Sequence, residues 1–152
     1  KAALIAAAFE LGRRAEAESN KDEPMRSPEM IYRFLGPQMQ QLPHESFRVL
    51  LLNTKLGLIR QEELFRGSVN ETVAHPREIF SKVLIHSAFA FAVAHNPPSG
   101  DPNPSDADVR LTRRLKEGAA ILRVEFFDHV IIGLPNPDRP QPYFSFRESG
   151  II

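Results

Sequence analysis

Three apolar runs, separated by stretches of helical periodicity, restrict the fold of this chain more than any other feature. The runs are ESFRVLLLNT at 45–54, AFAFAVA at 88–94 and VEFFDHVIIG at 124–133. Short runs that are apolar at consecutive positions are typical of strands buried on both faces of a sheet. Because helical segments lie between them, the alternation predicts an α/β domain.

The segments around the first and last runs add a helix and two strands. A serine cap followed by proline, Ser27-Pro28-Glu29, begins a helix that should end near Leu42-Pro43. The turn signal TKLG after the first run predicts a hairpin with a return strand at 58–69. The segment YFSFRESG at 143–150 alternates between apolar and polar residues, as a last strand would.

Two later helices are expected to begin at His75 and at Ser105, and residues at helical spacing identify their inner faces. The residues expected to face inward are Ile79, Phe80, Val83 and Leu84 in the first of these helices, and Leu111, Leu115, Ala119 and Leu122 in the second. The order of elements is then α-β-β-α-β-α-β-β, which predicts three layers with a mixed sheet.

The composition excludes several classes of protein. The chain of 152 residues contains no cysteine, which excludes disulfides and thiolate zinc sites. Basic and acidic residues balance at 19 each, and tight non-specific binding of nucleic acid usually requires a basic protein, so we expect no strong nucleic-acid binding. No apolar run approaches the roughly 20 residues of a membrane span, and no secretory signal is visible. We therefore expect a cytoplasmic protein without a membrane partner.

The first part of the chain is expected to lie outside the main domain. Residues 1–17 are alanine-rich, prone to form a helix and carry an apolar stripe with few partners nearby. Residues 18–27 are polar, contain a proline and are interpreted as a linker. Since the chain begins at Lys1 without a methionine, we interpret 1–26 as the tail helix and linker of a truncated N-terminal region, followed by a domain at 27–152.

A proline-rich loop, AHNPPSGDPNPSDAD at 94–108, connects a buried strand to a helix. His95 lies at the carboxyl end of the strand, and Asp108 lies in the first turn of the helix. Ligand sites in open α/β sheets gather at the carboxyl ends of strands, and the first turn of a helix offers free N–H groups and a positive dipole end. The loop therefore predicts a metal site or another polar site.

Each of these residues also has a purely structural explanation. Ser105 and Asp108 have the spacing of a capping box, in which both side chains bind free N–H groups of the helix. A histidine at a strand end, such as His95, commonly bonds to a carbonyl group. Glu45 taken alone is an ordinary carboxylate at the edge of a strand. Local sequence leaves capping and metal binding open for Asp108.

Six segments follow one another in a characteristic order, namely LLLNTKLGLI, HPREIF, HNPPSGDPNPSDAD, LTRRLKE, DHVIIG and YFSFRESG. Together they resemble the RadC family of the JAMM/MPN metalloprotease-like fold over residues 27–152. The leading KAALIAAAFELGRR resembles the end of the helix-hairpin-helix region that precedes this domain in the family. The resemblance implies a three-layer, cytidine deaminase-like mixed sheet flanked by helices, with a zinc-dependent metallopeptidase site.

The family pattern is His-x-His, ten further residues and Asp, with Ser three residues before that Asp and Glu on an upstream strand. Carried over, it implies His95 and Asp108 as zinc ligands, and Glu45 and Ser105 as the catalytic base and the oxyanion donor. The second histidine of the pattern falls on Pro97. A hydrolytic zinc site usually has three protein ligands, and proline supplies none. We therefore expect zinc binding to be weak or absent.

Three residues are candidates for the missing ligand. Asp101 lies in the same loop, but the resemblance implies that it points elsewhere. Glu45 could serve only by giving up its role as base. His129 could lie near the site by analogy of fold, and Asp128 beside it could orient its ring, as acidic partners often do.

Two functions follow from this pattern. The first is a zinc-dependent hydrolase that acts on an unidentified peptide or protein substrate and is impaired by Pro97. The alternative is a non-catalytic protein-interaction domain on the same fold, which the family name associates with DNA repair. A homodimer through a sheet edge is compatible with either function.

Overall fold

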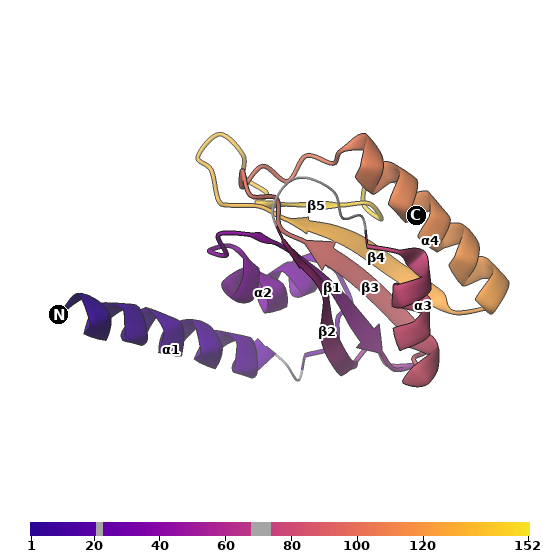
Figure 1. Cartoon of the computed structure of the whole chain (residues 1–152), viewed down its shortest axis with the longest axis horizontal. Coiled ribbons are helices and arrows are strands. Elements are labelled where there is room, and N and C mark those ends of the chain that lie inside the picture. The colour runs from indigo at the N-terminus through magenta and orange to yellow at the C-terminus, as the bar shows by residue number, and fades with distance from the viewer. Residues whose placement is uncertain (21–22, 68–73) are drawn as a thin grey trace.

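The computed structural model describes residues 1–20, 23–67 and 74–152, which form four helices and five strands (Figure 1). In chain order these are α1 (Ala2–Asn20), α2 (Pro28–Met39), β1 (Glu45–Leu52), β2 (Leu58–Gly67), α3 (Pro76–Ile85), β3 (Ala90–His95), α4 (Asp106–Leu122), β4 (Glu125–Ile132) and β5 (Tyr143–Ser145). The predicted α/β class is confirmed. In these described residues no helix is both long and apolar enough to cross a membrane.

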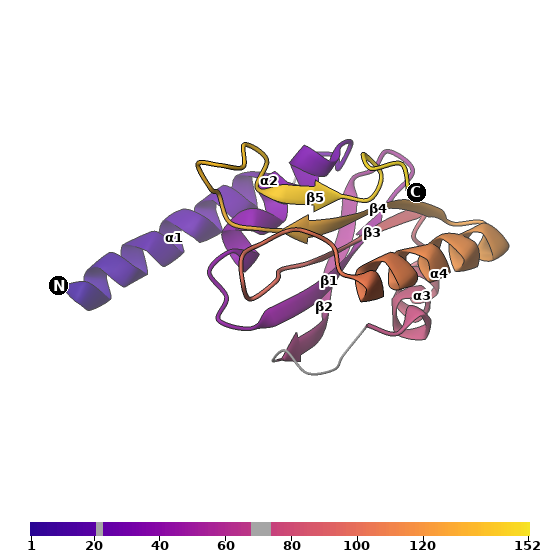
Figure 2. The same cartoon turned by 90° about the horizontal axis from the view of Figure 1, so that it is seen from above.

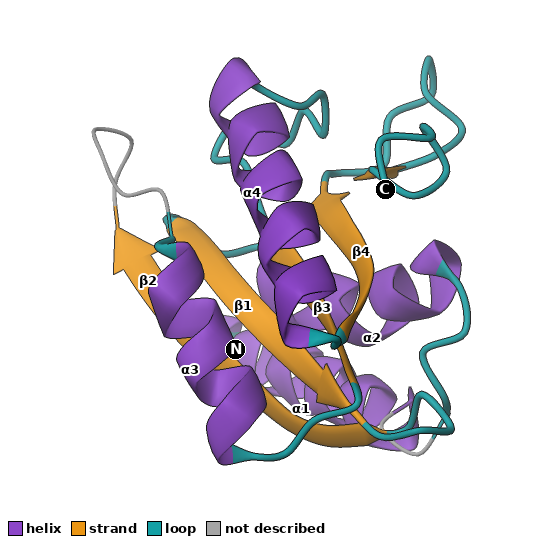
Figure 3. Cartoon of the chain, turned by 90° about the vertical axis from the view of Figure 1, so that its right-hand side faces the viewer, coloured by secondary structure: helices purple, strands orange, loops and turns teal. Residues whose placement is uncertain are grey.

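The strands form one mixed sheet in the order β2-β1-β3-β4-β5. β1 pairs antiparallel with β2 and with β3, and β5 pairs antiparallel with β4. β3 and β4 are parallel, and α4 is the crossover between them (Figure 3). Since a crossover returns the chain to the end at which the first strand began, β3 and β4 end at the same edge of the sheet. The start of α4 follows the end of β3 at this edge.

Helices cover both faces of the sheet and give the three predicted layers (Figures 1 and 3). On one face α2 packs its buried residues Ile31, Phe34, Leu35 and Met39 against the sheet. On the other face α3 and α4 do the same with Ile79, Val83, Leu111, Leu115 and Ala119. β1 contributes to both layers, with Leu50 and Leu52 on the α2 side and Val49 and Leu51 on the α4 side. The central strands are therefore buried on both faces, as their apolar runs predict.

Two predicted inward positions are wrong. Leu84 in α3 is 55% exposed and Leu122 in α4 is 40% exposed. Both lie in the last turn of their helices, in which Val83 and Ala119 are still buried but these two leucines are not.

Several element boundaries also differ from the prediction. α2 ends at Met39 rather than near Pro43, with Gln40 as its C-cap. The last strand is limited to Tyr143–Ser145, since Ser149 N–H donates to Ser145 O and the chain turns there. β2 ends at Gly67, and the last two residues of the predicted strand lie outside the described residues.

The predicted N-terminal helix is present and extends to Asn20, three residues beyond the predicted end. It extends away from the sheet (Figures 1 and 2), and Leu4, Phe9 and Leu11 on it are at least 70% exposed. Arg13 Nη1 donates to Pro37 O at 2.7 Å, which ties α1 to α2. The apolar stripe of α1 therefore stays largely uncovered by the described residues.

Candidate metal centre

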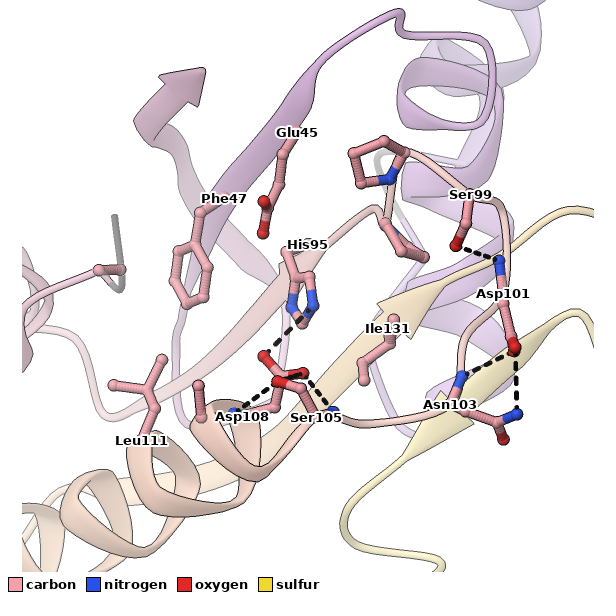
Figure 4. Close-up of a pocket in the computed structure, with 14 residues that line it drawn as sticks. Glu45, Phe47, His95, Ser99, Asp101, Asn103, Ser105, Asp108, Leu111 and Ile131 are labelled. Atoms are coloured by element: carbon pink, nitrogen blue, oxygen red, sulfur yellow. Dashed lines mark hydrogen bonds and ion pairs between the residues drawn. The ribbon is translucent and has the colours of Figure 1, made fainter. Parts of the chain in front are cut away.

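All four predicted site residues line one pocket at the edge where β3 ends (Figure 4). The pocket has a volume of about 420 Å³. Glu45 comes from β1, His95 from β3, and Ser105 and Asp108 from the start of α4. Apolar walls are supplied by Phe47, Leu111 and Ile131 together with Pro97 and Pro98. The loop and the crossover thus bring together residues that are as much as 63 positions apart in the sequence, from Glu45 to Asp108.

His95 is the last residue of β3 and is 5% exposed. It pairs in the sheet with Phe47 of β1 and with Ile131 of β4, which fixes its backbone on both sides. Its Nε2 lies 3.4 Å from Asp108 Oδ1 (Figure 4). Burial lowers the pKa of His95, and the Asp108 carboxylate opposes that shift. The ring therefore favours its neutral form, with one nitrogen available as a ligand.

Asp108 makes two kinds of contact, one through each oxygen of its carboxylate. Its Oδ2 accepts hydrogen bonds from the Ser105 backbone N–H at 2.8 Å and from the Ser105 hydroxyl at 2.7 Å. Ser105 Oγ in turn accepts from the Asp108 N–H at 3.2 Å, which completes the predicted capping box of α4. Asp108 Oδ1 faces His95. The Asp108 carboxylate therefore caps α4 through Oδ2 and faces the candidate metal ligand His95 through Oδ1.

Glu45 is the first residue of β1, and its carboxylate points toward the His95 ring (Figure 4). Burial raises the pKa of Glu45, and the nearby Asp108 carboxylate raises it further. Asn96 fixes the strand beside it, since its Oδ1 accepts from Ser46 N–H at 2.8 Å and its amide donates to His44 O at 3.0 Å. A carboxyl group with a raised pKa at this position is suited to accept and return a proton.

Pro97 lines the pocket at the position where the pattern requires a second histidine. Its carbonyl accepts the Gly100 N–H at 3.0 Å and closes a tight turn, and its side chain carries no donor atom. Asp101 also lines the pocket, but its carboxylate accepts from Asn103 N–H at 3.1 Å and lies 3.3 Å from Arg139 Nη2. Asp101 is thus held by other partners, in agreement with the expectation that it points elsewhere.

His129 lies directly behind His95, in the middle of β4. The Nε2 atom of His129 is 3.0 Å from Nδ1 of His95, and its own Nδ1 is 2.7 Å from Thr112 Oγ1. Candidate ligand atoms of His95, Asp108 and His129 all lie within 4.8 Å of one another. Burial lowers the pKa of His129 well below its ordinary value, and His95 lowers it further. These three residues form the His95/Asp108/His129 cluster, which could bind a metal.

Asp128 does not orient the His129 ring, so this prediction is wrong. Its Oδ1 accepts the backbone N–H of His129 at 2.7 Å, and its Oδ2 accepts the Ser145 hydroxyl at 2.6 Å. Successive side chains of a strand point to opposite faces of the sheet. Asp128 therefore faces away from the ring beside it, and Thr112 of α4 contacts that ring instead.

Sequence reasoning could not place His129 because β4 contains an irregularity. Phe91 pairs with Phe126, whereas Ala92 pairs with Asp128, so that Phe127 is an extra residue in β4. A bulge of this kind reverses the face of every residue that follows it. Counted from Phe126 by simple alternation, His129 would lie on the α2 side. The bulge turns it toward His95 and α4 instead.

A family model of the RadC-like JAB domain matches residues 25–151. The chain belongs to this family. Among curated RadC-family relatives, a UPF0758 protein of Shouchella clausii is 43% identical over 134 residues, which is 88% of this chain and 58% of that protein. UPF0758 proteins of Bacillus licheniformis and Methanosarcina acetivorans are 42% and 39% identical over 100% of this chain, and over 66% and 64% of their own length. The chain therefore spans about three fifths of the length of the curated relatives it matches.

The JAB-domain pocket fits a zinc ion only in part. With bonds of roughly 2.0 to 2.1 Å, two ligands of a tetrahedral zinc ion lie about 3.3 Å apart. The 3.4 Å between His95 Nε2 and Asp108 Oδ1 matches that spacing. Pro97 lines the pocket where the resemblance implies a second histidine, and its side chain has no atom that could bind a metal. His95 and Asp108 therefore supply two corners of a zinc site, and His129 is the remaining donor of the cluster.

Proposed function

We propose that this RadC-like JAB domain is a zinc-dependent hydrolase of the metallopeptidase class whose metal site is impaired by Pro97. The observation that carries the proposal is the approach of His95 Nε2 to within 3.4 Å of Asp108 Oδ1 in a pocket that Pro97 also lines, at the position where the resemblance implies a further histidine ligand. A neutral His95 with its hydrogen on Nδ1 presents a lone pair at Nε2 to the Asp108 carboxylate, and a cation between the two relieves their repulsion. Zinc held by two protein ligands is expected to bind weakly.

The other pocket residues have roles that suit hydrolysis of an amide bond in a peptide or protein. A bound zinc ion would lower the pKa of a water to about 7. Glu45, half-buried beside His95, takes a proton from the attacking water and returns it to the leaving amine. Ser105 donates to the developing oxyanion after turning its hydroxyl away from Asp108 Oδ2. The proposal includes no nucleic-acid partner, since the charges of the chain balance.

The test is the zinc content of three purified proteins, measured by elemental analysis after exchange into zinc-free buffer. They are the unmodified chain, Pro97→His, and Pro98→His as a matched control that adds an imidazole to the same pocket wall one residue away. We expect about one zinc ion per chain in Pro97→His and clearly substoichiometric zinc in the other two. Titration should show at least about a 10-fold gain in zinc affinity for Pro97→His.

Each other outcome overturns part of the proposal. Stoichiometric zinc in the unmodified chain would show that the site is intact and that an unforeseen group replaces the missing histidine. Equal zinc binding by Pro97→His and Pro98→His would show that position 97 is not a ligand position. No zinc in any of the three proteins would refute the assignment of His95 and Asp108 as ligands.

A non-catalytic protein-interaction domain is the second candidate, and the lining of the pocket favours it. Pro97, Pro98, Phe47 and Leu111 all line the pocket, so it presents apolar surface together with its polar groups. Such a pocket could hold an apolar side chain of a partner protein or of a second copy of the chain. Binding of a partner that persists after removal of metal, and after Glu45→Gln, favours this second function over hydrolysis.

A further inference from the structure

A chain of hydrogen bonds runs from the pocket into the interior behind His95. It passes from His95 Nδ1 to His129 Nε2 at 3.0 Å, and from His129 Nδ1 to Thr112 Oγ1 at 2.7 Å. It ends where Thr112 Oγ1 lies 2.7 Å from the backbone carbonyl oxygen of Asp108. His129 and Thr112 are fully buried, and His95 nearly so.

The direction of each hydrogen bond follows from the last one. A carbonyl oxygen can only accept, so the single hydrogen of the Thr112 hydroxyl is donated to Asp108 O. Thr112 Oγ1 must then accept from His129, which places a hydrogen on His129 Nδ1. A neutral His129 therefore has a lone pair at Nε2, and it accepts a hydrogen from His95 Nδ1.

This order of donors decides which nitrogen of His95 faces the pocket with a lone pair. Since His95 Nδ1 carries a hydrogen, the lone pair of the neutral ring is at Nε2. That atom is the one that lies 3.4 Å from Asp108 Oδ1. An imidazole that binds a metal usually donates its other N–H to a neighbouring group, and that donation fixes both its tautomer and its orientation.

We propose that His129 and Thr112 are positioning residues that hold His95 in the tautomer whose Nε2 lone pair faces the pocket. They are not metal ligands themselves. His129 stacks on Phe146, with ring centroids 4.7 Å apart and planes 13° from parallel, and both of its nitrogens already have partners. To bind a metal, His129 would have to give up the hydrogen bond that orients His95. The part of this inference that concerns metal affinity rests on the proposed function, whereas the tautomer does not.

The tautomer is measured directly in the metal-free protein by two-bond ¹⁵N–¹H correlation spectra of the histidine rings near neutral pH. In the unmodified chain we expect a protonated Nδ1 and an unprotonated Nε2 on both His95 and His129. Thr112→Val keeps the shape of the side chain and removes the hydroxyl, while Thr112→Ser keeps the hydroxyl and is the matched control. A buried N–H without an acceptor is unfavourable. In Thr112→Val, His129 should therefore move its hydrogen to Nε2, and His95 should move its own to Nε2.

The second readout is the affinity for Co²⁺, titrated into the same variants in the Pro97→His background. Thr112→Val should bind Co²⁺ about 10- to 100-fold more weakly than Thr112→Ser, because His95 must first give up the hydrogen on Nε2. Thr112→Ser should match the parent within about 3-fold, a margin typical of context effects on a retained hydrogen bond.

Three results would overturn the proposal. The first is a hydrogen on Nε2 of His95 in the unmodified, metal-free chain. The second is a Thr112→Val variant with unchanged tautomers of His95 and His129. The third is loss of the His129 Nε2 hydrogen bond on addition of Co²⁺, which would make His129 a ligand. Failure of the proposed function looks different, since then no variant binds Co²⁺ and the tautomers still follow the expected pattern.

Discussion

At the scale of single residues, Asp108 shows how one side chain can serve both the fold and the site. Its Oδ2 caps α4 through Ser105, while its Oδ1 faces His95. The two functions can be separated by substitution. An asparagine keeps one carbonyl oxygen for the cap and has an NH₂ group, which cannot bind a cation, in place of the other oxygen.

We expect Asp108→Asn to abolish metal binding by the Pro97→His protein with only a small change in stability. Asp108→Ala should also abolish it and should lower the free energy of unfolding by about 1 kcal/mol through loss of the cap. Urea unfolding followed by circular dichroism measures the stability of both variants, and zinc titration measures their binding. Equal destabilisation by the two substitutions would argue against a capping role for the carboxylate.

Residue patterns predicted the capping box at the start of α4, for a local reason. A cap is formed by residues three positions apart, so Ser105 and Asp108 carry their geometry in the sequence itself. The position of His95 at a strand end was also predictable from local sequence, because His95 directly follows an apolar run. Thr112 and His129 were not predicted as partners, because their contact depends on how α4 lies on β4. Their role can be inferred only once that packing is known.

At the scale of elements, the pocket depends on how closely the loop after β3 lies on the end of β4. Gly133 follows β4, and a Cβ atom there would lie 2.7 Å from Pro102 Cδ and 2.9 Å from Gly100 O. Gly100 O also accepts the Leu134 N–H at 2.9 Å. The loop that carries Pro97 therefore rests directly on the backbone of the neighbouring strand end.

Gly133→Ala should lower the free energy of unfolding by about 1–3 kcal/mol, because the clash involves backbone that cannot move freely. It should also weaken zinc binding by the Pro97→His protein, since the loop must shift. Gly12→Ala is the control, as no atom lies within 4 Å of a Cβ there and alanine favours a helix. Chemical denaturation of both variants checks this. A Gly133→Ala protein as stable as the control would show that the loop yields easily.

The order of the elements was predictable from hydrophobic periodicity, whereas the register between them was not. The bulge at Phe127 gives no signal in the apolar run of β4, where every position is suited to burial. Edges of elements were also poorly predicted, as Leu84 and Leu122 show. Periodicity reports the preferred face of a helix, but it does not report where the layer beneath it ends.

At the scale of the whole molecule, Asp128 connects the sheet to the C-terminal segment. Its Oδ2 accepts the Ser145 hydroxyl at 2.6 Å, and its Oδ1 accepts the Arg147 N–H at 3.0 Å. Burial raises the pKa of Asp128 to about 6, although these hydrogen bonds and the Arg147 guanidinium lower it. The carboxyl group lies in the layer on the α2 side of the sheet, opposite to the pocket.

This pKa predicts how stability changes with pH. Asp128 is protonated more readily in the folded chain than in the unfolded chain, where its pKa is about 3.9. Its contribution to stability is therefore fully present below about pH 4 and is lost as the pH rises through about 6. The change amounts to about 3 kcal/mol for a shift of about two units.

Asp128→Asn removes this titration and keeps an acceptor for the two backbone N–H groups. The difference in free energy of unfolding between the unmodified chain and Asp128→Asn should move in favour of the variant between about pH 4 and about pH 7. Urea unfolding at a series of pH values measures it, and comparison of the two proteins cancels the other titrating groups. A difference that stays constant over this range would contradict a raised pKa for Asp128.

The capping box carries a consequence for how related chains should be judged. A descendant of this domain that had lost all chemistry would still be stabilised by the capping pair Ser105 and Asp108 at the start of α4, so selection for folding alone would favour both. The presence of both residues in a related chain is therefore weak evidence that the chain is an active enzyme. Positions 45 and 97, on which no helix cap relies, are better places to look for the history of the activity.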